Sequence, residues 1–476
     1  MKLNLRVLIY LNPSNVDKVT HKFNLSADSG FIFVKNSILA LNEVEDWHFF
    51  VLVPPENYHC WPNKPNNVTL VKYPYVNDAL NSRFHFDTNA ISEYFNTYRH
   101  DIDLIWTMLP EHAGALRAFA NKRREEIPVF SYINWLDYKD SKGYEPSYIL
   151  RLLDGWENSH MIGVQSDHML KYMKNELLGQ YKPDYSKARV ITPKTSIPAH
   201  KSQINDDLIG FPHRVSAESR FEEMASFIFP HIKGKLWVSN INGANVENHE
   251  KLLVKSFESH DNYYQFLSTI RFGISYHVGY SMWSMSVLDM MACGKVVLAP
   301  NKNAFPEMFH KNYPFLFNNK EDFLNKLNYL QNCQADELKL WGDLNREIVE
   351  EKFTWKIQAK QLSEAFYSLV TDKKTPKTQS VLEAINEYGK ITKSDLINKN
   401  ITDYGRQCSR AWNKTRIELM RDHGIKDIHN SEHTTFVSAC HNPDEVIQRR
   451  PSKIPTKHDL KKFEEEINQP TFNLEG

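Results

Sequence analysis

Short apolar runs alternate with longer amphipathic segments along most of this 476-residue chain. Runs such as LRVLIYL, HFFVLVPP and IPVFSYI are continuous rather than alternating, which is typical of strands buried on both faces of a parallel sheet. The segments between them have the length of helices, and the first, FIFVKNSILALNEV, follows Gly30. Strands that alternate with helices predict a doubly wound α/β domain over residues 1–200.

A second series with the same alternation predicts another α/β domain over residues 201–355. Its apolar runs are LIGFPHRV, KGKLWVSNI, RFGISYH, KVVLAP and FLF. Ligands of doubly wound sheets lie beyond the carboxyl ends of the strands. We therefore expect two Rossmann-like domains that face each other across a ligand-binding cleft.

The stretch from Arg271 to Phe309 reads as one βαβ unit. Its parts are the strand Phe272–His277, the Gly/Ser-rich turn Gly279–Ser284, the apolar helix Ser286–Ala292 that Gly294 stops, and the strand Val296–Ala299. The first amides of such a helix, together with the positive end of its dipole, point to the place where a diphosphate can sit. Asp289, one turn further along, is placed to accept hydrogen bonds from a ribose.

The motif SVLDMMACGKVVLAP, followed by NAFPEMF, resembles the nucleotide-sugar signature of retaining GT-B glycosyltransferases, the large family-4-like group that includes glycogen synthases and mannosyltransferases. The resemblance implies a GT-B fold and a nucleotide-diphosphate-sugar donor, expected to be a UDP-sugar. It implies transfer of a hexose or pentose with retention. It also implies that residues 356–372 form a helix that crosses back to the first domain.

The same resemblance assigns roles within the βαβ unit. It implies that the amides of Ser286 and Val287 bind the distal phosphate and that Asp289 binds the ribose. The donor-binding residues expected in this unit are Ser284, Met285, Ser286, Val287 and Asp289. Ser281 stands eight residues before Asp289, where the family has an acidic residue that touches the donor sugar. We take Ser281 as a catalytic candidate, and this departure leaves the identity of the sugar open.

Two places in the first domain also resemble the family. Asp28-Ser29-Gly30 is similar to its first glycine loop, which implies that Gly30 approaches the donor phosphate, but the same residues fit an N-capped helix start. Glu111 and His112 follow the run DLIWTML, where the family often has a histidine that touches the donor sugar or the acceptor. We take both as catalytic candidates, against the alternative of a solvent-exposed loop histidine.

Positive charge for the diphosphate is expected after the first strand of the second domain. The family has Gly-Arg there, followed six residues on by Lys, and this chain has Arg214 and Arg220; an ordinary surface loop is the alternative. Arginine can bind phosphate bidentately. The DxD sequence Asp101-Ile-Asp103 precedes its strand, so we interpret it as the start of that strand and not as a metal site. We therefore expect no metal and no cofactor, with protein cations stabilising the leaving diphosphate.

Composition limits the classes of partner and compartment. Lys plus Arg and Asp plus Glu both number 58, so any attraction to nucleic acid must come from a local patch of positive charge.

The five cysteines include no CxxC pair, which favours reduced thiols over disulfide bonds. No apolar run approaches the length of a membrane span. We expect a soluble cytoplasmic protein without a membrane partner, in the host cytoplasm if a phage encodes it; the oligomeric state stays open.

Residues 373–444 predict a small C-terminal α+β domain beyond a polar linker. SVLEAINEYGKI, SDLINKN and a long segment that ends at Gly424 predict three helices, and KDIHNSEHTTFVSA predicts two strands joined by a polar turn. Three helices followed by a β-hairpin is the order of a winged helix. Residues 445–476 predict a charged tail.

The third helix of this extension carries a basic face. At 100° per residue, its basic side chains fall within about 80° of one another, opposite the apolar ones. They are Arg406, Arg410, Lys414 and Arg421. A one-sided basic helix in this position predicts binding to nucleic acid, and double-stranded DNA is the expected partner.

A glycosyltransferase-like core joined to a predicted nucleic-acid-binding domain suggests that the sugar acceptor is a nucleic acid. This combination resembles the DNA-modifying glycosyltransferases of bacteriophages, which place a sugar on the hydroxyl of a 5-hydroxymethylpyrimidine. Two alternatives stay open. The text NAFPEMFHKNYPFLFNNKEDFLNKL also resembles tRNA-queuosine mannosyltransferases. With Ser281 in place of an acid, the chain could also be a sugar-nucleotide-sensing, nucleic-acid-binding regulator without catalysis.

Overall fold

The computed structural model divides into two compact units, Met1–Lys373 and Lys374–Gly476. The structure describes residues 4–16, 20–75, 85–98, 102–120, 127–134, 136, 138, 147–199, 204–213, 215, 219–239, 249–257, 259–279, 281–371, 390–392, 426–429 and 434–437. No helix in these ranges is both long and apolar enough to cross a membrane.

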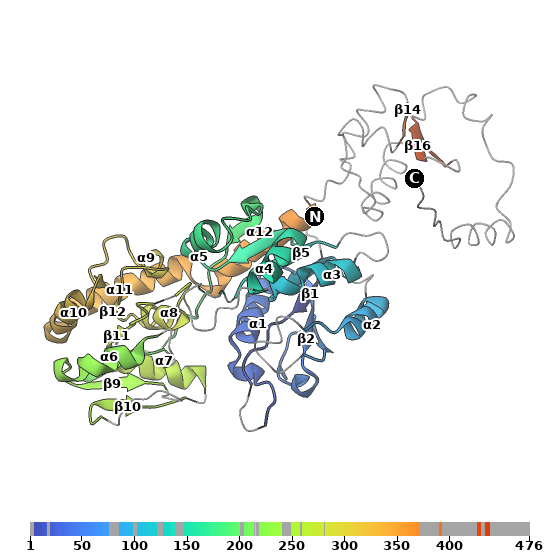
Figure 1. Ribbon diagram of the computed structural model, residues 1–476. Helices are drawn as coiled ribbons and strands as arrows, with labels where there is room; N and C mark the ends of the chain where they lie inside the picture. The colour runs from blue at the N-terminus through green and yellow to red at the C-terminus, as the bar shows by residue number, and fades with distance from the viewer. Residues whose placement is uncertain are drawn as a thin grey trace. The chain divides into compact units, whose positions relative to one another are not determined.

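Seven strands in the described part of the first domain form a parallel sheet in the order β3-β2-β1-β4-β5-β6-β7. Figure 1 labels β1, β2 and β5 of this sheet, with helices α1 to α5 beside it. The strands are β1 Arg6–Tyr10, β2 His48–Val53, β3 Val68–Lys72, β4 Leu104–Thr107, β5 Val129–Tyr132, β6 Met161–Val164 and β7 Ala188–Val190. The helices are α1 Ser29–Leu41, α2 Thr88–Tyr98, α3 Ala113–Ala120, α4 Ser147–Asn158 and α5 Asp167–Tyr172. Strands β4 and β5 are buried at every residue, which is why their sequences are continuous apolar runs.

The second domain holds a parallel sheet of six strands among its described residues, in the order β10-β9-β8-β11-β12-β13. The strands are β8 Asn205–Phe211, β9 Lys235–Val238, β10 Leu252–Val254, β11 Ile270–Ile274, β12 Val297–Pro300 and β13 Leu316–Phe317. The helices are α6 Phe221–Ile228, α7 His260–Thr269, α8 Met285–Ala292, α9 Phe305–Met308, α10 Lys320–Asn332 and α11 Ala335–Lys352. Two parallel sheets confirm the doubly wound α/β prediction, although the apolar runs do not predict β3, β6, β7 or β10.

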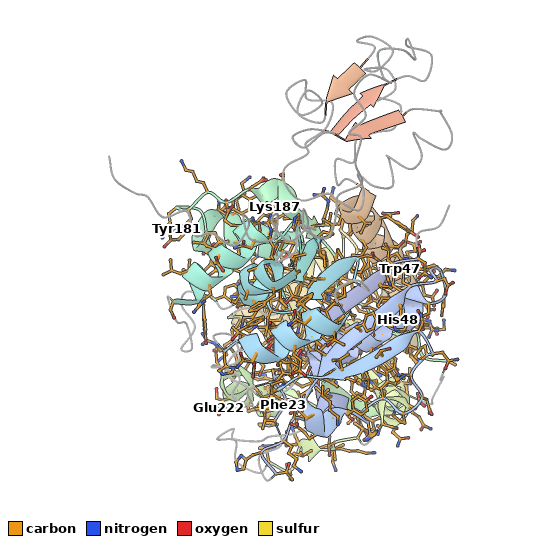
Figure 2. The ribbon with its side chains drawn as sticks, turned by 90° about the vertical axis from the view of Figure 1, so that its right-hand side faces the viewer. Phe23, Trp47, His48, Tyr181, Lys187 and Glu222 are labelled. Atoms are coloured by element: carbon orange, nitrogen blue, oxygen red, sulfur yellow. The ribbon has the colours of Figure 1, made fainter. Side chains whose placement is uncertain are left out.

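Helix α12, Trp355–Thr371, belongs by packing to the first domain although it follows the second in sequence. Its buried side chains Ala359, Leu362 and Phe366 recur at helical spacing and enter the first domain's core, next to α1. Trp47, labelled in Figure 2, lies just before β2. Its ring stacks on that of Phe366 with ring centroids 5.7 Å apart. The chain therefore crosses between the domains twice.

The two crossings lie against each other. The backbone N–H of Thr195, in the first crossing, donates to the carbonyl of Phe353 in the second at 2.9 Å. Lys194 is buried beside it, where its Nζ donates to the carbonyl of Lys352 at 2.8 Å. Burial lowers the pKa of Lys194 to about 7. These contacts make the two crossings one polar junction at the domain boundary.

The described residues of the second unit form a three-stranded antiparallel sheet in the order β14-β16-β15. Strands β15, Lys426–His429, and β16, Thr434–Val437, confirm the predicted hairpin. Strand β14, Lys390–Thr392, shows that the helix predicted for SVLEAINEYGKI is wrong at its last two residues, because Lys390 and Ile391 pair with β16. The other predicted helices, the basic residues Arg406, Arg410, Lys414 and Arg421, and the tail lie outside the described residues.

Candidate functional site

Helix α8 begins at Met285, one residue earlier than the sequence pattern predicts, because Ser284 is its N-cap. The Ser284 hydroxyl accepts a hydrogen bond from the backbone N–H of Val287 at 3.3 Å. In this structure the Val287 amide, expected to bind phosphate, is thus engaged by the cap. The amides of Met285 and Ser286 precede the first intrahelical bond, which Leu288 donates to the Ser284 carbonyl. The amides best placed for an anion are therefore those of Met285 and Ser286.

Asp289 lies on the same helix and is held from two other segments. Its Oδ1 accepts hydrogen bonds from the Thr195 hydroxyl at 2.5 Å and from the Tyr264 hydroxyl at 3.1 Å. Tyr264 belongs to α7, and Thr195 to the crossing between the domains. Burial raises the pKa of Asp289, although these two hydroxyls oppose the shift. The carboxylate is thus fixed where α7, α8 and the crossing meet, and its contact with a ribose stays a prediction.

Ser281 lies in the turn between β11 and α8 and is buried. Its hydroxyl donates to the carbonyl of Trp283 at 3.3 Å, and its own carbonyl accepts from the N–H of Ala304 at 3.4 Å. A neutral hydroxyl in this turn supplies no negative charge where the resembling family has an acid. Its catalytic role stays a prediction.

Arg220 stands at the start of α6 in a left-handed backbone conformation, with φ of +49°. A Cβ built on Gly279 would lie 3.4 Å from Arg220 Nε, so the guanidinium lies against the turn that leads to α8. Its Nη1 also forms a half-exposed ion pair with Glu223 at 3.3 Å. Arg214, the other predicted cation, lies outside the described residues.

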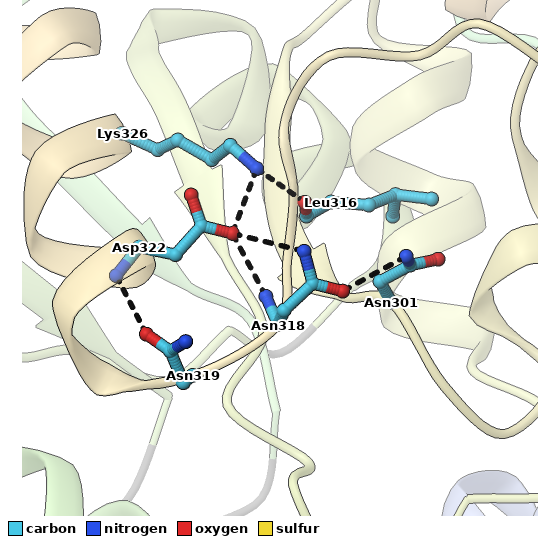
Figure 3. A network of polar contacts seen from close by, with 6 residues as sticks. All are labelled: Asn301, Leu316, Asn318, Asn319, Asp322 and Lys326. Carbon is cyan, nitrogen blue, oxygen red and sulfur yellow. Dashed lines mark hydrogen bonds and ion pairs between the residues drawn. The ribbon is translucent and has the colours of Figure 1, made fainter.

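Lys302 is a cation at this edge that the sequence pattern does not indicate. It follows β12 by two residues, and both burial and the positive charge of Arg220 lower its pKa. The loop that carries it is tied down by the network of Figure 3. There Asn301 donates to Asn318 at 3.0 Å, and Asp322 accepts from the Asn318 N–H at 2.9 Å. Strand order alone brings Lys302 to Arg220.

Glu307, on α9, connects the second domain to the first. Its two carboxylate oxygens accept from the backbone N–H groups of Asp167 at 2.9 Å and of His168 at 2.6 Å, at the start of α5. A carboxylate at a helix N-terminus interacts favourably with the helix dipole. The Ser166 hydroxyl also donates to the carbonyl of Met282 at 2.8 Å. The turn before α8 is thus linked to the first domain.

In the first domain, the Asp28-Ser29-Gly30 segment is a capped helix start. Asp28 is buried, and its Oδ1 accepts from the Phe31 N–H at 2.9 Å while its Oδ2 accepts from the Ser14 N–H at 2.8 Å. Gly30 packs closely under the first loop, because a Cβ there would lie 3.3 Å from the Asn12 carbonyl oxygen. The N-cap interpretation is confirmed, and a contact of Gly30 with phosphate stays a prediction.

His112 lies at the carboxyl edge of the first sheet, in the turn Pro110–His112 that follows β4. It is only 4% exposed, so the alternative of a solvent-exposed loop histidine is wrong. Its Nδ1 lies 3.1 Å from the hydroxyl of Tyr10, the last residue of β1, and its ring meets those of Tyr10 and Phe86 edge-on. Glu111 is half-buried on the same turn.

The second aspartate of the DxD sequence lies at the other end of the first sheet. Asp103 immediately precedes β4, where its Oδ2 accepts from the Arg6 N–H at 3.0 Å and pairs with Arg6 Nε at 3.5 Å. Asp101 lies outside the described residues. The carboxylate of Asp103 therefore fixes the start of the strand, as expected for strand entry.

A known protein family matches the second domain. Residues 221–364 match the family described as glycosyl transferase-like. This match includes α6, α7, α8 and the first part of α12, and so contains Asp289 and most of the residues around it. No curated protein matches the chain in sequence.

Solved structures match across both domains. Sucrose-phosphate synthase from Thermosynechococcus elongatus superposes with a TM-score of 0.60 at 14% identity, over 78% of this chain and 100% of that one. A glycosyltransferase from Rickettsia africae superposes with a TM-score of 0.57 at 14% identity, over 78% of this chain and 99% of that one. Anabaena HepE in complex with UDP superposes with a TM-score of 0.55 at 12% identity, over 77% of this chain and 100% of that one. The fold is therefore GT-B, and the findings together support a glycosyltransferase.

Arg220→Gly should weaken binding of UDP without lowering the melting temperature. A left-handed conformation costs a non-glycine residue roughly 1–2 kcal/mol, and an exposed ion pair contributes roughly 0–1 kcal/mol, so the substitution removes more strain than stabilisation. Loss of a guanidinium–phosphate bond should reduce affinity about 10-fold or more. Calorimetric titration and thermal unfolding measure the two effects, with Arg220→Lys as the variant that keeps the charge. An unchanged affinity would remove Arg220 from the site.

Proposed function

We propose that this protein is a retaining glycosyltransferase that moves a hexose or pentose from a UDP-sugar to a hydroxyl group on a modified base in DNA, of the 5-hydroxymethylpyrimidine type. The proposal has two parts, the donor and the acceptor. The donor part is supported by the geometry of the second domain, and the acceptor part by the sequence of the C-terminal unit.

One observation carries the donor part: the capped start of α8 and the side chain of Asp289 lie on one helix at the carboxyl edge of a parallel sheet. Amides for a phosphate and a carboxylate for a ribose are then separated by one helical turn, a spacing suited to a nucleoside diphosphate. Arg220 and Lys302 add positive charge at the same edge. The Anabaena HepE structures that contain UDP and UDP-glucose share this fold.

Release of UDP from UDP-sugars tests the donor part directly. The full chain, incubated with UDP-glucose and related donors without an acceptor, should release UDP slowly, and DNA that contains 5-hydroxymethylcytosine should accelerate release and gain the mass of one sugar per modified base. Binding of UDP-sugar without any release would favour a sugar-nucleotide-sensing regulator instead.

The acceptor test must also separate DNA from RNA. The resemblance of the 303–327 segment to tRNA-queuosine mannosyltransferases makes tRNA the second candidate acceptor. Mass spectrometry of hydroxymethylated DNA and of queuosine-containing tRNA, each incubated with the same protein and donor, distinguishes the two. Modification of tRNA alone would overturn the DNA proposal and leave the donor part intact.

Turnover should proceed without added divalent metal. Arg220, Lys302 and the amides of Met285 and Ser286 supply positive charge for the leaving diphosphate, which is the role that a metal ion plays in other transferases. We expect a chelator to change the rate of UDP release by less than about twofold. This is small, because removal of a single hydrogen-bond donor to the transition state typically lowers the rate roughly 10²-fold or more. Complete loss of turnover in chelator, with recovery on addition of magnesium or manganese, would contradict this expectation.

A further inference from the structure

Two histidines at the carboxyl edge of the second sheet lie outside the set of residues proposed to bind the donor. His213 follows β8 by two residues and His277 follows β11 by three. Because β8 and β11 are neighbouring parallel strands, these positions lie side by side. The two ring centroids are 4.2 Å apart, with an angle of 65° between the ring planes.

His213 has an unsatisfied buried nitrogen. The residue is 5% exposed, and its Nε2 has no hydrogen-bond partner among the described residues. Burial, reinforced by the adjacent His277, lowers the pKa of His213 well below its ordinary value, so the ring is neutral at pH 7. An unsatisfied buried polar group costs about 1–3 kcal/mol, and a partner absent from the protein alone is one explanation for it.

The groups around this pair favour an anion as that partner. His277 leads into the turn that holds Gly279, against which the Arg220 guanidinium lies. Arg220 and Lys302 carry positive charge at the same edge, while Glu223 is paired with Arg220 and with the Tyr276 hydroxyl. His277 itself is oriented by Ser275, whose hydroxyl lies 3.3 Å from its Nδ1. The ends of β8, β11 and β12 therefore combine two cations with an unsatisfied imidazole nitrogen.

A metal ion fits these residues less well. The rings meet edge to face, as packed aromatic rings do, and the described residues hold no group of three metal-binding side chains. Two imidazoles without a third ligand fall short of the usual transition-metal set.

We propose that His213 donates a hydrogen bond from Nε2 to a phosphate oxygen of the bound nucleoside diphosphate, with His277 as the residue that positions its ring. This inference rests on the proposed function and adds a donor contact to it. A phosphate dianion close to the ring favours the imidazolium form. Binding of the nucleotide should therefore take up a proton from solution, and the proton should reside on His213.

Calorimetry of UDP binding to the full chain at pH 7.5, in two buffers with different ionisation enthalpies, measures this proton uptake. The wild type should take up part of a proton. His213→Gln, which keeps an N–H donor but cannot ionise at this pH, should lose that uptake and bind UDP several-fold more weakly. His213→Phe keeps an aromatic ring but removes the N–H donor and the titrating group. It replaces the glutamine variant if that variant does not fold. His231→Gln is the matched control, because His231 is exposed just before β9, at the opposite edge of the sheet.

The outcomes separate the two proposals. If the wild type binds none of UDP, GDP and ADP, the proposed function fails. If the wild type binds UDP and both His213 variants keep its proton uptake and affinity, His213 does not contact the phosphate. A loss of uptake in the His213 variants but not in His231→Gln would support the contact, because a merely structural change has no reason to alter the number of protons bound.

Discussion

Asp289→Asn should reduce the affinity of the full chain for UDP by about 10- to 150-fold, which corresponds to the roughly 1.5–3 kcal/mol of a charge-assisted hydrogen bond. The substitution keeps the size of the side chain and an oxygen that can accept from Thr195 and Tyr264. It removes the negative charge that a ribose hydroxyl would bind. Calorimetric titration with UDP measures the loss.

The stability of the same variant should not fall. Burial raises the pKa of Asp289 above its unfolded value, so the ionised carboxylate destabilises the folded state at pH 7, and asparagine does not carry that charge. For the same reason, the wild type should gain stability relative to the variant as the pH is lowered from 7 through the folded pKa of Asp289. A large drop in melting temperature at pH 7 would show that the carboxylate serves the fold rather than the nucleotide.

Asp343→Asn provides the matched control for Asp289. Asp343 is exposed on α11 of the same domain, where its carboxylate pairs with Lys339. Its replacement should change neither the affinity for UDP nor the melting temperature by much, since exposed ion pairs contribute roughly 0–1 kcal/mol. If both variants lose affinity equally, the effect reflects the net charge of the domain and not a contact with ribose.

Removal of residues 376–476 should leave UDP binding and slow UDP release intact but abolish most sugar transfer to DNA. The first unit is compact by itself, so donor binding does not depend on the second unit for its residues. A base within a duplex must be approached through the major groove or flipped out, and this requires a grip on the duplex. The basic helix predicted from the C-terminal sequence would supply that grip through phosphates, without reading sequence.

A full-length variant tests the same idea without truncation. Replacement of Arg406, Arg410 and Lys414 together by alanine should weaken duplex binding and reduce its salt dependence by about one unit of slope for each phosphate that is no longer neutralised. Lys311, Lys320 and Lys339, replaced together, form a control of equal charge change on the first unit. If the truncated chain modifies DNA as well as the full chain does, the C-terminal unit has another role and the acceptor must be sought elsewhere.

Local sequence determines the elements of the βαβ unit. Gly294 ends α8 with φ of +68°, a conformation that glycine adopts without strain, and the apolar runs on either side become β11 and β12. The start of the helix differs from the predicted start by one residue, because Ser284 is the N-cap and Met285 becomes the first helical residue. Periodicity and capping depend on residues within one or two turns, so they can be read without the fold.

Tertiary structure decides which side chains meet. The Thr195 hydroxyl reaches Asp289 from 94 positions away, and Glu307 caps α5 from about 140 positions away. His213 meets His277 because β8 and β11 are neighbours, an order that no local pattern records. Strand order and the two domain crossings arise from burial over the whole chain. The sequence alone therefore indicates a nucleotide-binding helix, whereas the partners of Asp289, the cation Lys302 and the unsatisfied nitrogen of His213 emerge only when distant strands are packed side by side.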